Sequence, residues 1–507
     1  GIPFDIYQRL KQIPDAVGIY SNGRHFCLPG AHGGWPHDMT GVSFPGGENV
    51  VDPGRQYIDT LRRHVPEEFL NDKWLWAKEN WHGVPFEPDA FHSVVMDMFS
   101  ETGNCAVRLG TALIGADAQD GIVRKATLSD GHRISATSWV DGTGCGALCR
   151  MSGCEQLQGI DSKGAFGEDG APDEHIERVN APTLIFRVAK TDTPEVEPLP
   201  PGIPADFWWR DTPTSSCVNH YPNGDRNINM LPTMEGPEFL ALGWEKAYAE
   251  CRRRIHCHWH FLQTNFPEFQ YFRMHTIFPM LGVRESWRTV CDKMLTEGDI
   301  VGGLHQQTDP DIIAIADHSL DRHGQGGACP EVLFPYGIPY RCLVPRGYRN
   351  LLIACRGAGF SSIAASSARL SRTMMQLGQA AGNAVVLARE LGCPLPAVNP
   401  QRLRERLCEE HVQLEFPLTD QLQAYIVANQ KPKMQHAFGD VGLKPTTRRR
   451  ACRAASAQVF GPVVRIDRGT RVAAEDRPRQ RRIPARHSQE NGVVPASFAD
   501  RVDGLAG

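Results

Sequence analysis

The chain has 507 residues, of which 22% are charged and 41% are hydrophobic. This size and composition predict two or three globular domains and exclude a small scaffold that depends on disulfides. No run approaches the roughly 18 apolar residues that a membrane-spanning helix needs, and no signal peptide is recognisable. The formal net charge of −4 hides an asymmetry, because residues 446–507 contain 13 Arg, no Lys and 6 acidic residues. An acidic body with a basic extension is therefore expected.

Turn and periodicity signals predict helices and strands in the first third of the chain. Residues 1 to about 65 are rich in Gly, Pro and His and indicate irregular structure. Apolar side chains recur at helical spacing between Pro88 and Ser100, which predicts a helix. Three mostly apolar runs follow, at residues 106–116, 121–128 and 133–140. Asp130-Gly131 is a strong hairpin signal between the last two runs, so a β-meander is expected.

The later elements are predicted from apolar runs and capping signals. A strand is expected at residues 179–188, a helix from Glu238 to Phe261 and a buried strand from Asn350 to Cys355. A long helix of small residues, Ser361 to Leu391, should end at Gly392. Asn399-Pro400 should begin a last helix that ends near Leu407.

The composition after about residue 430 predicts a disordered tail. The segment lacks hydrophobic periodicity and is rich in Arg, Pro and Ala, so it cannot bury enough apolar surface to offset the entropy of ordering. Nucleic-acid binding is the functional alternative for so many Arg residues. The near absence of aromatic side chains disfavours it.

The segment from Trp139 to Ala147 (WVDGTGCGA) runs from an apolar strand into small residues. Such a turn lets a backbone approach a phosphate or a ring closely, and the N-terminus of the next helix favours negative charge. Gly142, Gly144 and Ala147 fit the G-x-G-x-x-A dinucleotide fingerprint, with Asp161 near the expected acidic position. The preceding hairpin favours another interpretation, the turn by which a β-meander rejoins a parallel sheet. A plain glycine-rich turn is the alternative to both.

Two motifs carry side chains suited to binding anions or moving protons. Arg284 and Arg288 in LGVRESWR are four residues apart, which places both on one face of a helix. Each guanidinium can hold a carboxylate or a phosphate. His323 follows Asp321 in a Gly-rich loop, where it could protonate or hold a substrate. In each motif an ion-paired or structural side chain is the alternative interpretation.

The last motif combines the strand at Asn350–Cys355 with the helix that follows it. RGAG at residues 356–359, SSAR at 366–369 and LGQAAG at 377–382 are rich in small residues. Such a helix can pack its backbone close to a neighbour, and its N-terminus favours negative charge. It is therefore suited to lie beside a reduced flavin, although tight packing under a sheet would need the same residue types.

The chain has 15 cysteines without a regular framework. The closest group, Cys145, Cys149 and Cys154, has the spacing C-x3-C-x4-C, which is looser than the C-x2-C repeats of most iron–sulfur sites. Small buried thiols are therefore favoured over an iron–sulfur cluster, and no metal site is predicted. Reduced cysteines indicate a cytoplasmic protein.

The motifs VDGTG, LGVRES, DRH, YGIPYRCLVP, NLLIACRG, SSARL and LGQAAGNA occur in the order found in FAD-dependent oxidoreductases with a two-dinucleotide-domain fold. Residues 1 to about 410 resemble this family, which is distantly similar to fumarate reductase flavoproteins and to the flavin subunit of heterodisulfide reductase. The resemblance implies an α/β fold, with a Rossmann-like FAD-binding domain, an inserted α+β substrate domain and a disordered C-terminal tail. The family normally opens with a strand and G-x-G-x-x-G. Nothing precedes Gly1, so the first βαβ unit is expected to be missing.

The resemblance also implies domains and site residues. The FAD-binding domain would comprise residues 1–154 and 278–410, around a substrate domain at 155–277 and before an extension at 411–507. Arg284 would clamp an anionic substrate group, His323 would donate or accept a proton, and Arg369 would stabilise the reduced flavin. The residues expected to bind FAD are Asp141, Gly142, Thr143, Gly144, Arg356, Gly357, Ser367, Gly378 and Gln379.

The expected activity is the transfer of a hydride or an electron pair between FAD and an organic, anionic small molecule. The electron acceptor or donor is not identified by any motif. Two alternatives stay open. The chain could be an NAD(P)-dependent dehydrogenase that uses the Gly142–Ala147 turn, or a truncated relative without catalytic activity. Some members of the family carry a [4Fe-4S] cluster on dedicated cysteine runs, and no such run is found here.

Overall fold

The computed structural model describes residues 1–17, 24–26, 86–210, 216–221, 223–318, 320–324, 332, 334–416, 418 and 420–429. All of them belong to one compact unit, Gly1–Val464. Most of the segment predicted to be irregular before residue 65, and the tail predicted to be disordered after about residue 430, lie outside the described residues. None of the helices among the described residues is long and apolar enough to cross a membrane.

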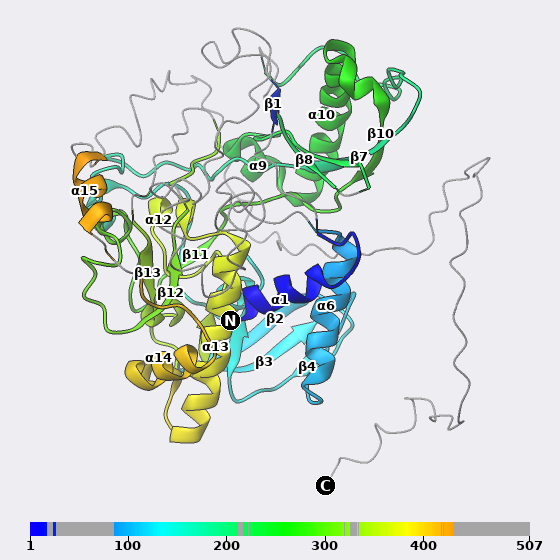
Figure 1. The fold of residues 1–507 in the computed structure, drawn as a ribbon. Helices are drawn as coiled ribbons and strands as arrows, with labels where there is room; N and C mark the ends of the chain where they lie inside the picture. The colour runs from blue at the N-terminus through cyan, green and yellow to red at the C-terminus, as the bar shows by residue number, and fades with distance from the viewer. Residues whose placement is uncertain are drawn as a thin grey trace, which may run out of the picture. The chain divides into compact units, whose positions relative to one another are not determined.

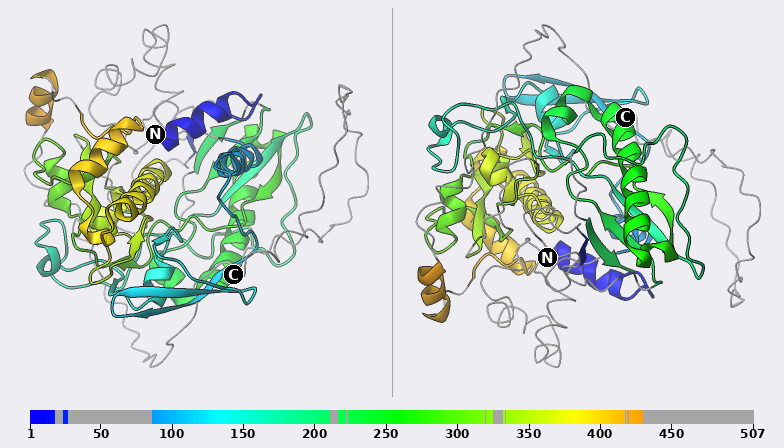
Figure 2. Two further views of the ribbon diagram at one scale, coloured as in Figure 1. Left: turned by 90° about the horizontal axis from the view of Figure 1, so that it is seen from below. Right: turned by 90° about the horizontal axis from the view of Figure 1, so that it is seen from above.

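The first described element is a helix, α1 (Ile2–Lys11), which corrects the prediction of irregular structure there. Ile6 and Leu10 are one turn apart and both buried, so this short helix gains its stability from packing. It lies against α6 (Pro88–Glu101) and against the long helix α13 (Ser371–Leu391), as Figures 1 and 2 show. The backbone amide of Ile2 donates to Gln379 Oε1 on α13 at 3.0 Å.

The predicted β-meander is confirmed. Strands β2 (Leu113–Gln119), β3 (Ile122–Leu128) and β4 (Arg133–Ile134) form an antiparallel three-stranded sheet in that order. Asp130 Oδ1 accepts a hydrogen bond from the backbone amide of His132 at 3.1 Å, and Gly131 has a φ of 86°, as a tight hairpin requires. The first strand begins seven residues later than residue 106, where the sequence placed it, because residues 105–110 are exposed and form no strand pairing in the described part of the chain.

A parallel pair of strands follows the meander. Strand β5 (Trp139–Asp141) pairs with β14 (Leu351–Ile353), and the short helix α7 (Ala147–Met151) comes directly after the turn. The next strand, β6 (Gln156–Leu157), pairs antiparallel with β11 (Arg288–Thr289) and not with β5. The turn after β5 therefore does not open a βαβ unit, which is the context that the NAD(P) interpretation needed.

A five-stranded antiparallel sheet has a hydrophobic core of its own, formed by residues between Val179 and Leu281. Its order is β1 (Arg24–Phe26), β8 (Ser216–His220), β9 (Arg226–Asn229), β7 (Ile185–Lys190) and β10 (Phe272–Ile277). The single helix predicted at Glu238–Phe261 is two helices, α9 (Gly236–Leu242) and α10 (Trp244–Asn265). Gly243, with a φ of 71°, breaks the helical path between them.

The second core gathers β14, the antiparallel pair β12 (Ile312–Ala316) and β13 (Tyr336–Pro339), and the C-terminal helices. The long helix predicted at Ser361–Leu391 is interrupted, with α12 at Ser362–Ser367 and α13 beginning at Ser371. Its predicted end is confirmed, since Gly392 is left-handed with a φ of 63°. Asn399 caps α14 (Pro400–Glu409) by accepting from the Arg402 amide at 3.0 Å.

The remaining elements are short. They are α8 (Lys163–Phe166), α11 (Glu297–Gly302), α15 (Asp420–Asn429) and the 3-10 turns Pro267–Tyr271, Tyr340–Leu343 and Leu395–Ala397. Among the described residues a third, smaller hydrophobic cluster surrounds Ile6, Leu10 and Val94. The inserted domain, with its boundaries at residues 155 and 277, stays a prediction.

Candidate functional site

Three of the charged residues singled out in the sequence converge where the loop after β12 meets the break between α12 and α13. Asp321 lies at the centre of this group. Its Oδ2 atom is 2.6 Å from His323 Nε2 and 2.7 Å from an Arg369 terminal nitrogen, which also donates to the Asp321 carbonyl at 2.9 Å. Arg369 occupies the helix break itself, and its Nε donates to the Ser366 carbonyl at 2.8 Å. The interrupted helix thus directs a guanidinium at the histidine loop.

Arg284 approaches the same group from another segment. Its guanidinium donates to Thr183 Oγ1 at 2.7 Å and to the Ala181 carbonyl at 3.0 Å. Burial, followed by the charge of Arg369, lowers the pKa of Arg284 to about 9. Burial and the charge of Arg284 likewise lower the pKa of His323 to about 4. Ala181 links Arg284 to this group, because its amide donates to the His323 carbonyl at 3.1 Å while its carbonyl accepts from Arg284. We call Arg284, His323 and Arg369, with Asp321 and Arg356, the charged cluster.

The charged cluster has more positive than negative groups. Arg356 joins it because its Nε donates to the Arg369 carbonyl at 3.2 Å, and burial together with the charge of Arg369 lowers its pKa. Among the described residues, Asp321 is the carboxylate that pairs with Arg369, while Arg284 and Arg356 form no ion pair. Like charges in a buried region are costly without a counter-charge, so the cluster is suited to an anionic ligand.

Asp321 and a residue beside the cluster, His318, were missed as functional candidates. Asp321 was quoted as part of a motif but given no role, although its position two residues before His323 was the available signal. His318 follows β12, is buried, and has its Nε2 atom 3.8 Å from Asp321 Oδ2. Its Nδ1 atom is buried without a hydrogen-bond partner among the described residues. No sequence pattern distinguished His318 from the other histidines.

The turn after β5 lies beside the segment after β14, as the sequence predicted. The Ala354 amide donates to the Asp141 carbonyl at 2.9 Å, and Asp141 pairs with Ile353 in the parallel register. A Cβ atom on Gly357 would lie 3.1 Å from the Gly146 backbone nitrogen, so this close approach needs glycine. The two segments assigned to one cofactor therefore do meet in space.

Within that turn the side chains are already bonded to the protein. Asp141 accepts from the Thr143 amide at 2.9 Å, from Thr143 Oγ1 at 2.7 Å and from the Cys149 amide at 2.9 Å. Thr143 Oγ1 in turn accepts from the Ala147 amide at 2.8 Å. The side chains of Asp141 and Thr143 thus stabilise the turn, and a ligand would contact its backbone groups. Cβ atoms on Gly142 and Gly144 would meet nothing within 4 Å, so the space above the turn is open.

The other residues expected to bind FAD are distributed along α12 and α13. Ser367 is buried, with its hydroxyl donating to the His318 carbonyl and 2.6 Å from the Tyr336 hydroxyl, so it adjoins the charged cluster. Gln379 is bonded to the Ile2 amide at 3.0 Å and to Glu410 at 2.8 Å. A Cβ atom on Gly378 would meet nothing within 4 Å. Ser367 and Gln379 have protein partners, and their cofactor roles stay predictions.

Arg288 differs from Arg284, although the two were predicted to share a helix face. That helix prediction is wrong, because the segment is extended. The Gly282 amide donates to the Thr183 carbonyl at 2.7 Å, and Arg288 begins β11. Arg288 is fully buried and makes two bonds to Asp161, at 2.6 and 3.1 Å. Asp161 also accepts from the Ser362 amide at 2.7 Å, so this pair fastens the start of α12.

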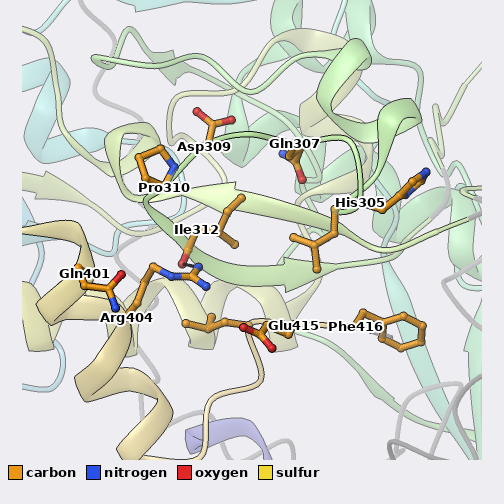
Figure 3. A pocket seen from close by; sticks show the side chains of 11 residues that line it. His305, Gln307, Asp309, Pro310, Ile312, Gln401, Arg404, Glu415 and Phe416 are labelled. Carbon is orange, nitrogen blue, oxygen red and sulfur yellow. Dashed lines mark hydrogen bonds between the residues drawn. The ribbon is translucent and has the colours of Figure 1, made fainter. Parts of the chain in front are cut away.

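A surface pocket of about 500 Å³, shown in Figure 3, is lined by Ile312 at the start of β12, whereas the charged cluster includes the loop after the end of β12. Figure 3 shows Arg404 lying against Ile312, and its guanidinium donates to the Ile312 carbonyl at 2.6 Å. Asp309, on the same wall, is bonded to Lys293 and to Arg341, each at 2.6 Å. Because no predicted site residue lines the pocket, the charged cluster is the better candidate for chemistry.

The cysteine and metal predictions can be examined for part of the chain. Eleven cysteines whose side chains the structure describes are free thiols, and Cys149 and Cys154 among them are buried. A side-chain hydrogen bond with Cys154, then burial, raises the pKa of Cys149 well above its usual value. Within the described ranges no three His, Cys, Asp or Glu side chains are grouped so that they could hold a metal ion.

The donor groups beside the open turn suit a dinucleotide. Arg150, on α7 directly after the turn, has its Nε and one terminal nitrogen buried without a hydrogen-bond partner in the described part of the chain. A guanidinium of this kind is a good partner for a phosphate. The N-terminus of α13 has no side-chain cap, so its first amides are available for a negatively charged ring. FAD therefore fits the residues between the turn and the charged cluster.

A family model described as FAD dependent oxidoreductase matches residues 47–407. No curated protein shows significant similarity to the chain.

Several solved structures are weakly similar. A geranylgeranyl bacteriochlorophyll reductase-like protein from Thermoplasma acidophilum is 12% identical, with a TM-score of 0.31, over 66% of this chain and 62% of that chain. The flavin-dependent halogenase BrvH from Brevundimonas sp. BAL3 is 11% identical, with a TM-score of 0.28, over 80% of this chain and 64% of that chain. The L-proline dehydrogenase from P. horikoshii is 11% identical, with a TM-score of 0.27, over 79% of this chain and 81% of that chain. The chain thus matches less than two thirds of the length of the first two.

Proposed function

The chain belongs to the family of FAD-dependent oxidoreductases, and from this premise we propose that it transfers a hydride or an electron pair between FAD and an anionic organic small molecule. Its fold is the α/β, Rossmann-like FAD-binding fold of that family. The single observation that carries the substrate class is the excess of positive charge in the charged cluster. Arg284 and Arg356 lie near Arg369 without an ion pair to a described carboxylate.

The chain's own residues take three roles in this proposal. Arg284, which lies between the inserted sheet and the cluster, binds a carboxylate or similar group of the substrate and orients it. His323 holds or moves a proton, because its ring is bonded to Asp321 through Nε2 and its Nδ1 atom has no bonded partner among the described residues. Its lowered pKa of about 4 keeps the ring neutral near pH 7. Arg369 and the uncapped N-terminus of α13 supply positive charge where the flavin ring is proposed to lie.

FAD, when bound, accepts or supplies the electron pair. The open space above Gly142 and Gly144 and the buried guanidinium of Arg150 support its placement along the turn after β5. The NAD(P) alternative is disfavoured because β6 pairs with β11 rather than with β5. Free thiols at the described cysteines support a reducing, cytoplasmic location. The electron acceptor or donor is not assigned.

Pairs of small carboxylic acids and their primary amides test the proposed substrate class. The FAD-loaded chain is mixed without oxygen with each member of a pair, and the loss of the blue absorbance of oxidised flavin is followed. The dithionite-reduced chain is tested in the same way for the reverse direction. We expect the acid of a reactive pair to react faster than its amide, because the amide has the same size but no charge for Arg284. Equal rates for acid and amide in every reactive pair would contradict the proposal.

A further inference from the structure

The Asp321 carboxylate is shared by two cluster members through one oxygen atom. Oδ2 lies 2.6 Å from His323 Nε2 and 2.7 Å from Arg369. The same Arg369 nitrogen also donates to the Asp321 carbonyl at 2.9 Å. Arg369 therefore bridges the side chain and the backbone of Asp321 and restrains the carboxylate. Arg369 is itself fixed by its bond to the Ser366 carbonyl at 2.8 Å. His323 therefore meets a rigid acceptor.

The backbone of His323 is fixed independently of Asp321. Its amide donates to Asn180 Oδ1 at 3.0 Å, and its carbonyl accepts from the Ala181 amide at 3.1 Å. Asn180 is in turn bonded through its own amide to buried Glu285 at 3.0 Å. The hydrogen bonds of the His323 backbone and the contact of Nε2 with Asp321 together orient the imidazole ring. No described residue is bonded to its Nδ1 atom.

We propose that Asp321 is the positioning residue of this site, fixing the Nε2–H tautomer of His323 so that Nδ1 is the atom that exchanges a proton with the substrate. This inference rests on the proposed function. An ionised carboxylate can only accept, so Nε2 must carry the hydrogen, and in a neutral imidazole Nδ1 then has the free lone pair. In the oxidative direction a proton leaves the substrate for Nδ1, and in the reductive direction it returns. The bound cofactor takes up or supplies the electron pair.

The charges around His323 agree with this assignment. Burial opposes ionisation of Asp321, but His323 and Arg369 outweigh it and hold the pKa of Asp321 well below its usual value. Burial and the charges of Arg284 and Arg369 disfavour a protonated His323, and Asp321 acts against them. His318 also faces Asp321, at 3.8 Å. When Nδ1 takes up a proton, the resulting imidazolium is thus stabilised mainly by Asp321, as in other carboxylate–histidine pairs.

The tautomer can be measured directly. The FAD-loaded chain is prepared with ring-labelled ¹⁵N-histidine, and long-range ¹H–¹⁵N correlations are recorded near pH 7. The signals of His323 are assigned by their loss in His323→Gln. We expect a neutral ring with hydrogen on Nε2. A wild-type ring protonated on Nδ1 alone, or on both nitrogens, would overturn the proposal whether or not any Asp321 variant folds.

Two Asp321 variants separate hydrogen bonding from charge. Asp321→Ala removes the acceptor and should give a mixture of tautomers, whereas Asp321→Asn keeps an oxygen acceptor and should keep Nε2–H. Asp317→Ala is the matched control, because Asp317 pairs with Arg372 in the same loop and should leave the His323 tautomer unchanged. An Asp321→Ala spectrum with pure Nε2–H would overturn the proposal.

Kinetics supply a readout that a purely structural role would not give. With an acid that reacts in the acid–amide comparison, Asp321→Ala, which removes the acceptor that fixes the tautomer, should slow the turnover of flavin by about 10²- to 10⁴-fold, the usual contribution of general acid–base catalysis, with little change in KM. An unchanged rate, or a change confined to KM, would contradict the positioning role. Because the tautomer is measured without substrate, its result stands or falls separately from the proposed substrate class.

Discussion

Arg284 and Arg288 lie four residues apart on one extended segment, yet their surroundings are opposite. Arg288 is fully buried and is bonded twice to Asp161, so its charge is neutralised where it lies. Arg284 is bonded to neutral groups, Thr183 Oγ1 and the Ala181 carbonyl, and lies near Arg369 and Arg356. A buried arginine that is ion-paired holds structure, whereas one that is left with like charges is suited to a ligand.

The largest effect is expected at the paired arginine. Arg288→Met leaves Asp161 as a buried carboxylate without its partner, which should cost about 3–5 kcal/mol of unfolding free energy in denaturant titrations. The double variant Arg288→Met with Asp161→Asn removes both charges and should recover part of the loss. A loss near zero for the single variant would show that the pair is not a structural anchor.

Arg284 should respond in the reverse sense. Arg284→Ala should weaken the apparent binding of an acid substrate by about 2–5 kcal/mol, measured as KM, because a buried charge pair with the substrate is lost. Its unfolding free energy should change less than that of Arg288→Met. Arg284→Lys is the control, because it keeps the charge without the planar guanidinium. Its KM should lie between those of wild type and Arg284→Ala. An unchanged KM in Arg284→Ala would disprove the clamp.

Glu285 lies between Arg284 and Arg288 in the sequence, and its ionisation should make the stability of the protein depend on pH. Burial, opposed in part by the charge of Arg288, raises the pKa of Glu285 to about 7. A raised carboxyl pKa gives stability that is complete below the unfolded pKa and is lost as the pH rises through about 7. Wild type should therefore lose stability relative to Glu285→Gln between about pH 5 and pH 8, by about 1.4 kcal/mol for each unit of pKa shift.

Melting temperatures of wild type and Glu285→Gln across that pH range provide the measurement. Other groups titrate in both proteins, so only the difference between them reports Glu285. If the two curves run parallel, Glu285 is ionised in the native protein and its pKa is not raised.

The smallest effect on stability is expected at the turn after β5. Gly142→Ala adds a methyl group to open space, so the unfolding free energy without FAD should change by less than about 1 kcal/mol. The same methyl group should weaken FAD binding, measured by flavin fluorescence titration. Gly164→Ala, also in open space but in α8, is the matched control and should bind FAD as wild type does. Equal FAD affinity in all three proteins would remove the turn from the cofactor site.

Local signals predicted much of the fold. The Asp130-Gly131 hairpin, the end of α13 at Gly392 and the cap at Asn399 depend on residues close in sequence, and each is confirmed. The helix predicted around Arg284 failed because a tertiary contact, the pairing of Gly282 with Thr183, overrides local helical spacing. The break before α13 was likewise not predictable, because Arg369 in this break is ion-paired with Asp321, a residue far from it in the sequence.

The candidate site was predicted in part. The motifs identified Arg284, His323 and Arg369, and the structure brings these three together. His318 was missed because no sequence pattern distinguishes it, and the contacts that make Asp321 central, to His323, Arg369 and His318 through one oxygen atom, appear only in the fold. The pairing of Arg288 with Asp161, which separates it from Arg284, joins residues far apart in the chain and needs the fold to be seen.

The most direct test of the account is a crystal structure of the FAD-loaded chain with malonate, a small dicarboxylate. We predict that the flavin ring lies between the Gly142–Gly144 turn and the charged cluster, with a malonate oxygen about 3 Å from the Arg284 guanidinium. A flavin bound instead in the pocket beside His305 and Phe416 would contradict the account. So would malonate held elsewhere, with Arg284 still bonded only to Thr183 and Ala181.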